Sequence, residues 1–385
     1  MNRVNLLDLA PLHLALEDEL LAAARRVITT QRFVLGDEGR ALEREIADYV
    51  GVSSAVGCAS GSDALLLALR ALDVDADQVV VTTPQSFFAT AGAPARLGTS
   101  VDFVDVEPET MNLDPASLRD YLAGCARGAD GALLAPRSGK RVTTVIAVDL
   151  FGRPCRYDQL EALCAEYGLN LIEDAAQSLG AAVGERRCGA FGRVGTLSFY
   201  PTKNLGGAGD GGMLTTSDEA LAARLRSLRI HGQGAKGTYF HDEVGWNSRL
   251  DELQAALLRV KLPHLDAGND ARRAHAAAYD AAFADLAGVE PLATPSPEVR
   301  AIYHLYVVRA QRRDELRAHL DAAGIGSGVY YPLPLHLQRC FKGFGYTEGT
   351  LPVAERLSRE VLALPMYAEL TVEQRQRVID AVRAF

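Results

Sequence analysis

The stretch SAVGCASGSDALLLALRALDVDADQVVVTTP, residues 54 to 84, indicates the fold of this 385-residue chain. It opens with a short apolar run, continues as SDALLLALRAL with apolar residues at helical spacing, and ends in the β-branched run QVVVTTP. A strand, a helix and a second strand in this order predict a crossover unit of a parallel sheet. Both apolar runs are short and almost continuous, as is typical of strands that are buried on two faces.

The same alternation continues downstream of this unit. FFATAGAPARLG reads as a helix, SVDFVDV and VTTVIAVDLFG as strands, YDQLEALCAEYG as a helix and LNLIEDAAQS as a strand. The sequence therefore predicts an α/β fold in which a mostly parallel sheet is sandwiched by helices. Ligands of such sheets bind beyond the carboxyl ends of the strands, so candidate functional residues are sought there.

The flanking segments predict the domain organisation. Apolar positions recur at helical spacing over 12–29 and over 38–51, while 121–141 is rich in Gly, Ala and Arg and reads as a surface insertion. From about residue 250 the chain becomes helical, with a long helix expected to bridge two domains. We expect a large domain over 1–250, with N-terminal helices and the central sheet, and a smaller C-terminal α+β domain over 251–385.

The composition narrows the function classes. Hydrophobic residues make up 48% and charged residues 23%, as in a soluble globular enzyme, and a net charge of -9 argues against nucleic-acid or anionic-membrane partners. No apolar run reaches membrane-spanning length, so a cytoplasmic location is expected. The six cysteines show no spacing that suits a metal, which predicts reduced core thiols and no metal site.

Gly61, Ser62 and Asp63 stand where the first strand turns into a helix. Free backbone N–H groups at a helix start, with the helix dipole behind them, suit a phosphate, and a glycine allows close approach. Ser and Asp are also common helix caps. The residues alone leave both interpretations open.

The strand LNLIEDAAQS ends in two carboxylates, Glu173 and Asp174. Because side chains alternate along a strand, one of the two is expected to face the ligand crevice, with Gln177 one turn later. A carboxylate there can hold a cationic ring nitrogen in its protonated state. The alternative is a structural acid that caps the next segment.

Lys203, one of only five lysines, lies inside LSFYPTKNLGGAGDGGMLTT, residues 197 to 216. A lysine with reduced solvation is a better amine nucleophile and can capture an aldehyde, whereas a surface lysine would simply extend into water. Gly207, Gly209 and Gly212 match G-x-G-x-x-G, but a strand-like segment follows them where a dinucleotide site requires a helix. A nicotinamide site is therefore not expected.

Pyridoxal 5'-phosphate has three groups that a protein can bind, which are its phosphate, its ring nitrogen and its aldehyde. The sequence offers one partner for each, in the form of a helix start, a carboxylate and an amine. TPQSFFATAG adds an aromatic face at another strand end, from Phe87 or Phe88. The sequence predicts this cofactor and no metal.

Several motifs resemble the DegT/DnrJ/EryC1/StrS sugar aminotransferases, which have fold type I of the aspartate aminotransferase superfamily. The matching stretches are GDEGRALEREIADYVG, ASGSDAL, IEDAAQSLGA, GTLSFYPTKNLGGAGDGGML, RIHGQG, GWNSRLDELQAALL and YYPLPLHLQ. They span nearly the whole chain, and SFYPTKN and NSRLDELQAA are the most specific.

The resemblance implies a role for each matching position. Lys203 would bind the cofactor covalently and shuttle the proton, Asp174 would pair with the ring nitrogen, and Gln177 would contact the ring hydroxyl. The remaining implied cofactor contacts are Phe87 on the ring, Gly61, Ser62 and Ser198 on the phosphate, and Asn247 on the phosphate from a neighbouring subunit. The implied substrate contacts are Arg249, Tyr331 and His336.

The resemblance also implies the reaction. L-Glutamate would give up its amino group and leave as 2-oxoglutarate. A nucleotide-linked ketosugar would receive the amino group and become an aminosugar. The enzyme would be a homodimer whose two subunits share their active sites. A dTDP-linked keto-6-deoxyhexose is the favoured substrate, and the sequence leaves the keto carbon, C3 or C4, the carrier, dTDP, UDP or GDP, and the pathway open. Asp149 and the 121–141 insertion depart from the family pattern and are expected to bear on sugar contacts.

Two other functions are considered. Some family members use the cofactor to dehydrate sugars, but those carry His in place of the cofactor-binding lysine. A non-catalytic dimeric sensor or scaffold would be expected to lose Lys203 or Asp174, and both are present.

Overall fold

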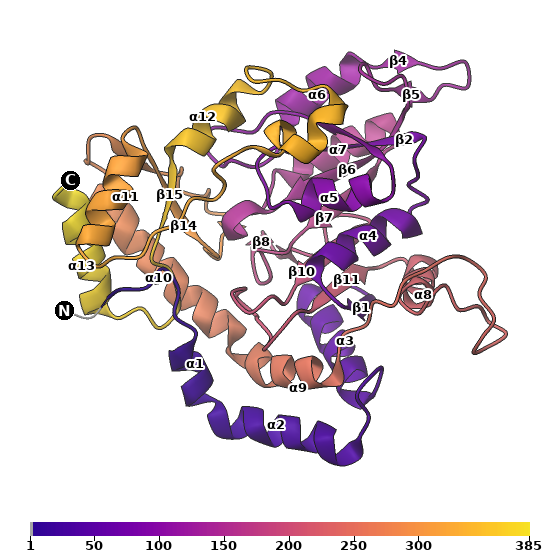
Figure 1. Ribbon diagram of the computed structural model, residues 1–385, viewed down its shortest axis with the longest axis horizontal. Helices are drawn as coiled ribbons and strands as arrows, with labels where there is room; N and C mark the ends of the chain where they lie inside the picture. Colours follow the sequence, from indigo (N-terminus) through magenta and orange to yellow (C-terminus); the bar gives the residue numbers. More distant parts are fainter. Residues whose placement is uncertain (1–2) are drawn as a thin grey trace.

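The computed structural model describes residues 3–385 and contains a large central sheet with helices on both faces (Figure 1). Its main path follows the order β1 (Ser54–Cys58), β11 (Gly212–Thr216), β10 (Val194–Ser198), β7 (Asn170–Asp174), β6 (Arg141–Val148), β2 (Gln78–Thr82) and β3 (Ser100–Phe103). β11 pairs antiparallel with both neighbours, and every other pair on this path is parallel. The predicted, mostly parallel α/β sheet is confirmed.

The strands of the opening stretch do not pair with each other. β1 forms one edge of the sheet beside β11, whereas β2 lies near the opposite edge between β6 and β3. The crossover helix α4 (Gly61–Ala71) therefore connects two distant strands across one face of the sheet. Sequence periodicity predicts the elements, but pairing depends on partners that occur later in the chain.

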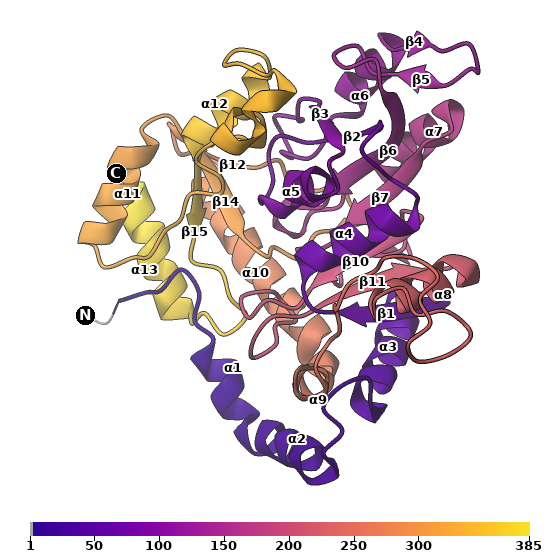
Figure 2. The same ribbon diagram turned by 45° about the vertical axis from the view of Figure 1, so that its right-hand side comes forward.

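Helices cover the two faces of the sheet in two groups (Figure 2). One face packs against α3 (Asp37–Val50), α6 (Pro115–Ala123), α7 (Tyr157–Tyr167) and α9 (Glu252–Lys261), and the other against α4, α5 (Ala89–Arg96) and α8 (Glu219–Leu228). Because both faces are covered, the strands are buried almost throughout, which explains their continuous apolar runs.

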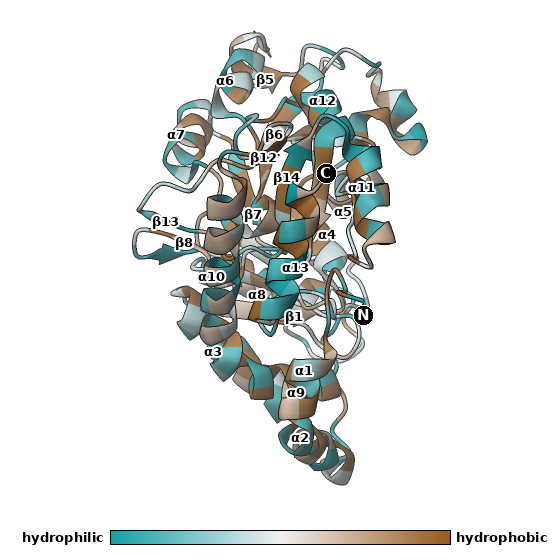
Figure 3. Ribbon diagram, turned by 90° about the vertical axis from the view of Figure 1, so that its left-hand side faces the viewer, coloured by the Kyte–Doolittle hydropathy of each residue, from teal (hydrophilic) through white to brown (hydrophobic). Residues whose placement is uncertain are grey.

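The N-terminal helices project from the body of the molecule. The periodicity over 12–29 forms two helices, α1 (Ala10–Ala15) and α2 (Glu17–Thr30), that meet at Leu16, and the helix predicted over 38–51 is α3. α3 ends at Gly51 in a left-handed conformation with φ of 86°, which glycine adopts without strain. Hydrophobic residues recur along α2 at the lower end of the view (Figure 3), and Leu14, Leu21 and Ile28 are exposed.

The 121–141 insertion forms the end of α6 and a short hairpin. Its strands are β4 (Ala126–Arg127) and β5 (Leu133–Leu134), and β5 joins the large sheet through β6. The Arg137 guanidinium lies 4.0 Å from the ring centre of Tyr346 and donates to the Gly345 carbonyl at 3.0 Å. The insertion therefore packs on the C-terminal part of the chain.

A smaller sheet forms a second core with the order β12 (Val289–Pro291), β14 (Tyr306–Ala310) and β15 (Val361–Leu364). Its helices are α10 (Leu265–Phe283), α11 (Arg313–Ala322), α12 (Pro352–Glu360) and α13 (Val372–Arg383). Both chain ends lie beside this sheet (Figure 1), where Val4 is fully buried. α9, by contrast, places Ala255 and Leu258 in the core of the large sheet. The predicted domain boundary between residues 250 and 251 stays a prediction.

The remaining elements are short. A third small sheet has β13 (Val299–Arg300), β8 (Ala182–Val183) and β9 (Arg186–Arg187), and 3-10 turns form η1 (Leu150–Gly152), η2 (Leu262–His264), η3 (Leu335–Leu337) and η4 (Arg339–Phe344). All six cysteines are free thiols, and Cys58, Cys155, Cys164 and Cys188 are buried as expected. Among residues 3–385, no helix combines the length and apolar character needed to cross a membrane.

Candidate active site

A cavity of about 520 Å³ opens at the carboxyl edge of the large sheet. Its walls come from segments that follow β1, β2, β7 and β10, from the end of β6, and from the turn before β14. The predicted residues that line it are Gly61, Ser62, Phe87, Asp174, Gln177, Ser198, Lys203 and Tyr331. Because parallel strands end at one edge, residues that are far apart in sequence meet here.

The start of α4 forms one end of the cavity. Ser60 is the helix cap, since its Oγ accepts a hydrogen bond from the Asp63 amide at 3.1 Å. The first N–H groups of a helix have no intrahelical partners, so the amides of Gly61 and Ser62 are available for an anion at the positive end of the helix dipole. The cap and the phosphate cradle therefore coexist at this helix start, with different residues in each role.

Gly61 is required because Ser198 approaches the helix closely. A Cβ at Gly61 would lie 2.7 Å from the Ser198 Cβ, a distance at which one of the two segments must move. Ser198 ends β10, so this contact joins the helix start to the strand that leads to Lys203. Glycine here is what brings the serine hydroxyl to the helix terminus.

Replacing Gly61 by alanine should raise the dissociation constant of pyridoxal phosphate by about tenfold or more, because the added methyl group displaces Ser198 or the first turn of α4. Titration of the apoenzyme with the cofactor, followed by absorbance, measures this. Gly343→Ala is the matched control, since its Cβ would meet nothing within 4 Å. Equal affinities for Gly61→Ala and the wild type would contradict the assignment of this helix start to the phosphate.

Asp174 is the acid that reaches the cavity. It is 5% exposed and accepts hydrogen bonds from Thr90 Oγ1 at 3.0 Å and from the Ala176 amide at 3.3 Å. Burial raises the pKa of Asp174, and the hydrogen bonds and the charge of Lys203 oppose that rise. Glu173 faces the other side of the strand, where it accepts from the Gly189 and Phe191 amides.

Lys203 lies in the loop between β10 and β11 and lines the same cavity. Burial lowers its pKa to about 8, while the Asp174 carboxylate opposes this change. The neutral amine, which is the nucleophilic form, is therefore far more populated near neutral pH than in an ordinary lysine. The glycines that follow lead into strand β11, as the sequence predicted, where a dinucleotide fingerprint requires a helix.

Three further predicted residues line the cavity, namely Gln177, Tyr331 and Phe87. Gln177 Oε1 accepts from the Phe151 amide at 2.7 Å, which leaves its Nε2 to donate, and Tyr331 Oη lies 3.4 Å from that nitrogen. The Phe87 and Tyr331 rings are 6.4 Å apart at their centres. Phe88 instead stacks on Phe341 at 5.3 Å, so the structure places Phe87 at the cavity.

Three predicted site residues do not line the cavity of their own chain. Asn247 is exposed and Arg249 is half-buried, both in the segment before α9. His336 is only 1% exposed: its Nε2 lies 3.1 Å from Glu355 Oε1, and its ring packs near Phe103. His336 belongs to η3, and its side chain packs into the interior of the protein. It therefore does not line the cavity, where a substrate contact was predicted.

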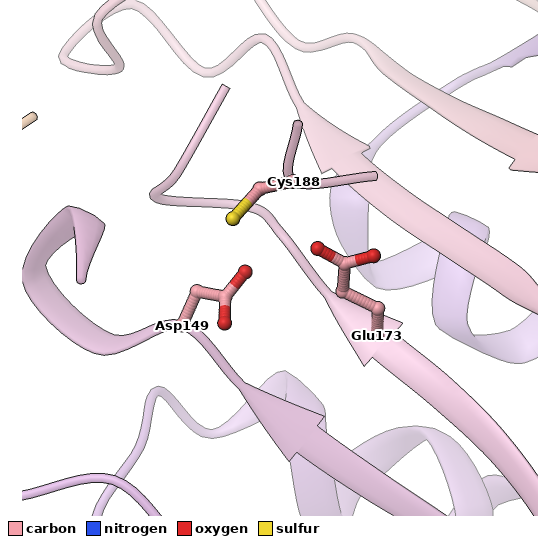
Figure 4. Close-up of side chains that lie close together, drawn as sticks. All are labelled: Asp149, Glu173 and Cys188. Carbon is pink, nitrogen blue, oxygen red and sulfur yellow. The ribbon is translucent and has the colours of Figure 1, made fainter. Parts of the chain in front are cut away.

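Asp149 requires a correction, because it does not contact the cavity where sugar contacts were expected. It is fully buried together with Glu173 and Cys188 (Figure 4). Its carboxylate accepts from the Cys155 amide, the Tyr157 hydroxyl and the Ser178 hydroxyl. The 121–141 insertion does not line the cavity either. Neither of the two features that depart from the family pattern, Asp149 and this insertion, therefore contributes to the cavity wall.

The oxygens of this acidic cluster are already engaged by protein donors. Glu173 accepts from two amides, and burial together with the neighbouring Asp149 raises the pKa of Glu173 well above its usual range. A proton shared between the two carboxyl groups removes one buried charge. The carboxylates of this cluster therefore already have hydrogen-bond donors within the core. Neither of them is left free to bind a metal ion.

Sequence reasoning missed several cavity residues, which are Ser86, Thr90, Tyr200, Thr202, Asp210, His304 and Tyr330. Thr90 lies in the quoted segment TPQSFFATAG, three residues after Phe87, so helical spacing could have suggested it. His304 and Tyr330 belong to the C-terminal third of the chain. Their strands and loops show no local signal that places them beside Lys203.

The chain that builds this site matches a known family. The profile of the DegT/DnrJ/EryC1/StrS aminotransferase family matches residues 15–383. The chain belongs to this family. It is accordingly an aminotransferase, and the cofactor of the family is pyridoxal phosphate.

Three relatives are similar over almost the whole chain. The "Pleiotropic regulatory protein" of Geobacillus stearothermophilus is 42% identical, over 99% of this chain and 98% of its own. A dTDP-3-amino-3,4,6-trideoxy-alpha-D-glucose transaminase of Streptomyces venezuelae is 41% identical, with coverage of 99% and 96%. A UDP-N-acetyl-3-dehydro-alpha-D-glucosamine 3-aminotransferase of Acidithiobacillus ferrooxidans is 39% identical, with coverage of 99% and 97%.

Solved structures agree with this membership. DesV of S. venezuelae superposes with a TM-score of 0.92 at 40% identity, over 100% of this chain and 98% of that one. NtdA of Bacillus subtilis, solved with bound pyridoxamine phosphate, gives a TM-score of 0.85 at 25% identity, over 95% and 80%. The cavity fits such a group, since it combines free helix amides beside a required glycine, a buried acid and an amine of lowered pKa.

Proposed function

We propose that this aminotransferase moves the amino group of L-glutamate to the C3 keto carbon of a nucleotide-linked sugar and releases 2-oxoglutarate. The observation that carries the proposal is the Lys203 amine, with its pKa lowered to about 8, in one cavity with Asp174 and the open start of α4. These groups hold the cofactor, and the rest of the cavity is left for the donor and the sugar.

The relatives support both the sugar and the position of its keto group. The Streptomyces relative is named for a dTDP-linked 3-amino sugar, and the Acidithiobacillus relative for a UDP-linked 3-dehydro sugar. We therefore propose a 3-keto substrate, with a dTDP-linked 6-deoxyhexose as the first candidate. Which nucleotide is attached to the sugar is left to experiment, because relatives of similar identity are named for sugars linked to different nucleotides.

When bound, pyridoxal phosphate supplies an aldehyde for the amines and a ring that stabilises negative charge at the reacting carbon. Asp174, which lines the cavity, would pair with the ring nitrogen and hold its proton through charge attraction. With the cofactor bound, Lys203 Nζ would take the proton from the donor α-carbon and pass it to the cofactor in the first half of the cycle, and would move a proton in the opposite direction, to the carbon of the acceptor, in the second half. The amides of Gly61 and Ser62 would bind the phosphate and so fix the ring relative to Lys203.

The transfer can be followed with labelled nitrogen. The holoenzyme, incubated with ¹⁵N-glutamate and a panel of dTDP- and UDP-linked 3-keto and 4-keto sugars, should give a ¹⁵N-labelled 3-amino sugar nucleotide by mass spectrometry. Label in a 4-amino product alone would overturn the C3 assignment. Failure of glutamate to bleach the visible absorbance of the bound cofactor would overturn glutamate as the donor.

The alternative functions are less consistent with the chain. A dehydratase of this family is expected to carry His where Lys203 stands, and Lys203 lines the cavity. The name of the Geobacillus relative describes regulation, but family membership places this chain among aminotransferases. We therefore do not propose a non-catalytic sensor.

We further propose that the enzyme is a homodimer in which Asn247 completes the phosphate site of the partner subunit. Asn247 is exposed and lies outside the cavity of its own chain. The nearby loop also exposes large apolar side chains, with Tyr239 at 89% and Val244 at 81%, as is common in interfaces. An intact site would then require two chains.

A heterodimer of Lys203→Ala and Asn247→Ala chains should have about half of the wild-type activity, although each homodimer is inactive or weak. One of its two sites combines the intact Lys203 of one chain with the intact Asn247 of the other. Co-expression with two affinity tags and sequential purification isolates this species. The heterodimer of Lys203→Ala with the wild type is the control, and an inactive Lys203→Ala/Asn247→Ala pair would show that Asn247 serves its own chain.

A further inference from the structure

The segment between β2 and α5 contacts Asp174 from across the sheet. Thr90, in the first turn of α5, donates from its Oγ1 to Asp174 Oδ2 at 3.0 Å. β6 lies between β7 and β2 in the sheet, so this contact crosses the end of a strand and joins residues 84 positions apart. Ser86 and Thr90 line the same cavity as Asp174.

The direction of the hydrogen bonds at Thr90 follows from the chemistry of the groups. An ionised carboxylate only accepts, so the single hydroxyl proton of Thr90 points to Asp174. Ser86 Oγ lies 2.7 Å from Thr90 Oγ1. Because the Thr90 proton is already used, the proton between the two hydroxyl groups comes from Ser86. Ser86 therefore donates to Thr90, and Thr90 donates to Asp174.

The hydrogen bonds to Asp174 fix the orientation of its carboxylate. Oδ2 accepts from Thr90, and Oδ1 accepts from the Ala176 amide at 3.3 Å. A carboxylate offers about four lone-pair sites, so both oxygens can still accept from a group in the cavity. Burial and the nearby Asp149 disfavour the ionised form of Asp174, whereas its two donors and the charge of Lys203 favour that form. Thr90 is therefore a donor that helps to keep a buried carboxylate charged.

The segment that carries the two hydroxyl groups is itself held in place by the C-terminal part of the chain. The Leu335 amide of η3 donates to the Pro84 carbonyl at 2.7 Å. Ser358 Oγ of α12 donates to Gln85 Oε1 at 2.9 Å. Both hydroxyl-bearing residues are buried, so water does not readily take the place of either hydroxyl.

We propose that Thr90, oriented by Ser86, is a positioning residue for Asp174: it holds the carboxylate in one orientation and keeps it charged for the ring nitrogen of the cofactor. Thr90 acts through Asp174 and does not need to touch the reacting atoms. The part in catalysis rests on the proposed function, in which Asp174 pairs with the ring nitrogen. The contacts themselves lie within the chain.

Substitutions of Thr90 separate this role from simple packing. Thr90→Val removes the hydroxyl group with little change in volume, and Thr90→Ser keeps it. Loss of a donor disfavours the charged carboxylate, so the pKa of Asp174 should rise by about one pH unit in Thr90→Val and stay at the wild-type value in Thr90→Ser. Thr196→Val is the matched control, because Thr196 is also buried but donates to the Glu173 carbonyl.

The measurement is NMR of the apoenzyme with ¹³C-carboxyl-labelled aspartate over a series of pH values. The Asp174 signal is identified by its absence in Asp174→Asn. An unchanged Asp174 midpoint in Thr90→Val would overturn the proposal, and so would an equal rise in Thr196→Val. A rise in Thr90→Ser as large as that in Thr90→Val would also overturn it, because serine keeps the hydroxyl group.

The holoenzyme gives a second readout of the same role. Glutamate should bleach the cofactor absorbance about tenfold more slowly in Thr90→Val than in the wild type, because the acid is less often charged. Equal rates in the two proteins would overturn the positioning role. A wild-type enzyme that glutamate does not bleach would instead contradict the proposed function, and the apoenzyme midpoints would still test the contact between Thr90 and Asp174.

A measurement on the wild type covers the case in which a variant does not fold. Neutron diffraction from deuterium-exchanged apoenzyme crystals at neutral pH should place the Thr90 deuterium between its Oγ1 and Asp174 Oδ2. The Ser86 deuterium should point to Thr90 Oγ1. A deuterium on Asp174 that points to Thr90 would reverse the direction of donation and overturn the inference.

Discussion

Lys203→Ala should lower the rate of amino transfer by at least about 10³-fold, because the chain loses both the amine that binds the cofactor and the base that moves the proton. Nothing else in the cavity replaces it. Among residues 3–385, Lys203 is the only lysine that lines this cavity, and His304, which also lines it, has no amine. Glutamate should no longer bleach the cofactor absorbance at a measurable rate.

Two readouts establish that this loss is chemical. Borohydride reduction of the wild-type holoenzyme, followed by peptide mapping, should place the cofactor on residue 203, and Lys203→Ala should carry none. Lys140→Ala is the control, since Lys140 does not line the cavity and its amine donates to the Ala76 carbonyl. A wild-type enzyme that carries its label on another lysine would remove the basis for the proposed mechanism.

Asp174→Asn should lower the rate of both half-reactions by about 10²- to 10³-fold with little change in volume. The carboxylate holds the proton of the ring nitrogen by opposite charge, and an amide cannot supply that charge. Thr90 Oγ1 and the Ala176 amide, which donate to Asp174, would then face an amide that can accept at only one of its two polar atoms. Stopped-flow spectra with glutamate measure the first half-reaction alone.

Asp210→Asn is the matched control for Asp174→Asn. Asp210 also lines the cavity, but it is exposed to solvent, so neutralising it should change the rate by less than about threefold. Equal losses in the two variants would mean that the cavity needs negative charge in general. A loss confined to Asp174→Asn would support a charge aimed at one ring atom.

The order of strands and helices was predictable because each element carries its own periodicity. Buried strands need apolar side chains on both faces, and helices that cover a sheet need one apolar stripe, so both patterns are local. The strand ends could also be read, which is why Gly61, Asp174, Ser198 and Lys203 were named in advance and are found in one cavity. Local signals also separated the glycines after Lys203 from a nicotinamide site.

The class of the fold and the reactive groups at the strand ends can therefore be read from local patterns in the chain. Packing across the fold places Phe87 at the cavity and Phe88 on Phe341, buries His336 beside Glu355, and brings His304 to the cavity that Lys203 lines. The physical reason is that these choices depend on contacts between segments more than 18 residues apart in the chain. Periodicity shows which residues a strand or helix buries, but the neighbour against which each is buried is set by packing and by hydrogen bonds across the fold.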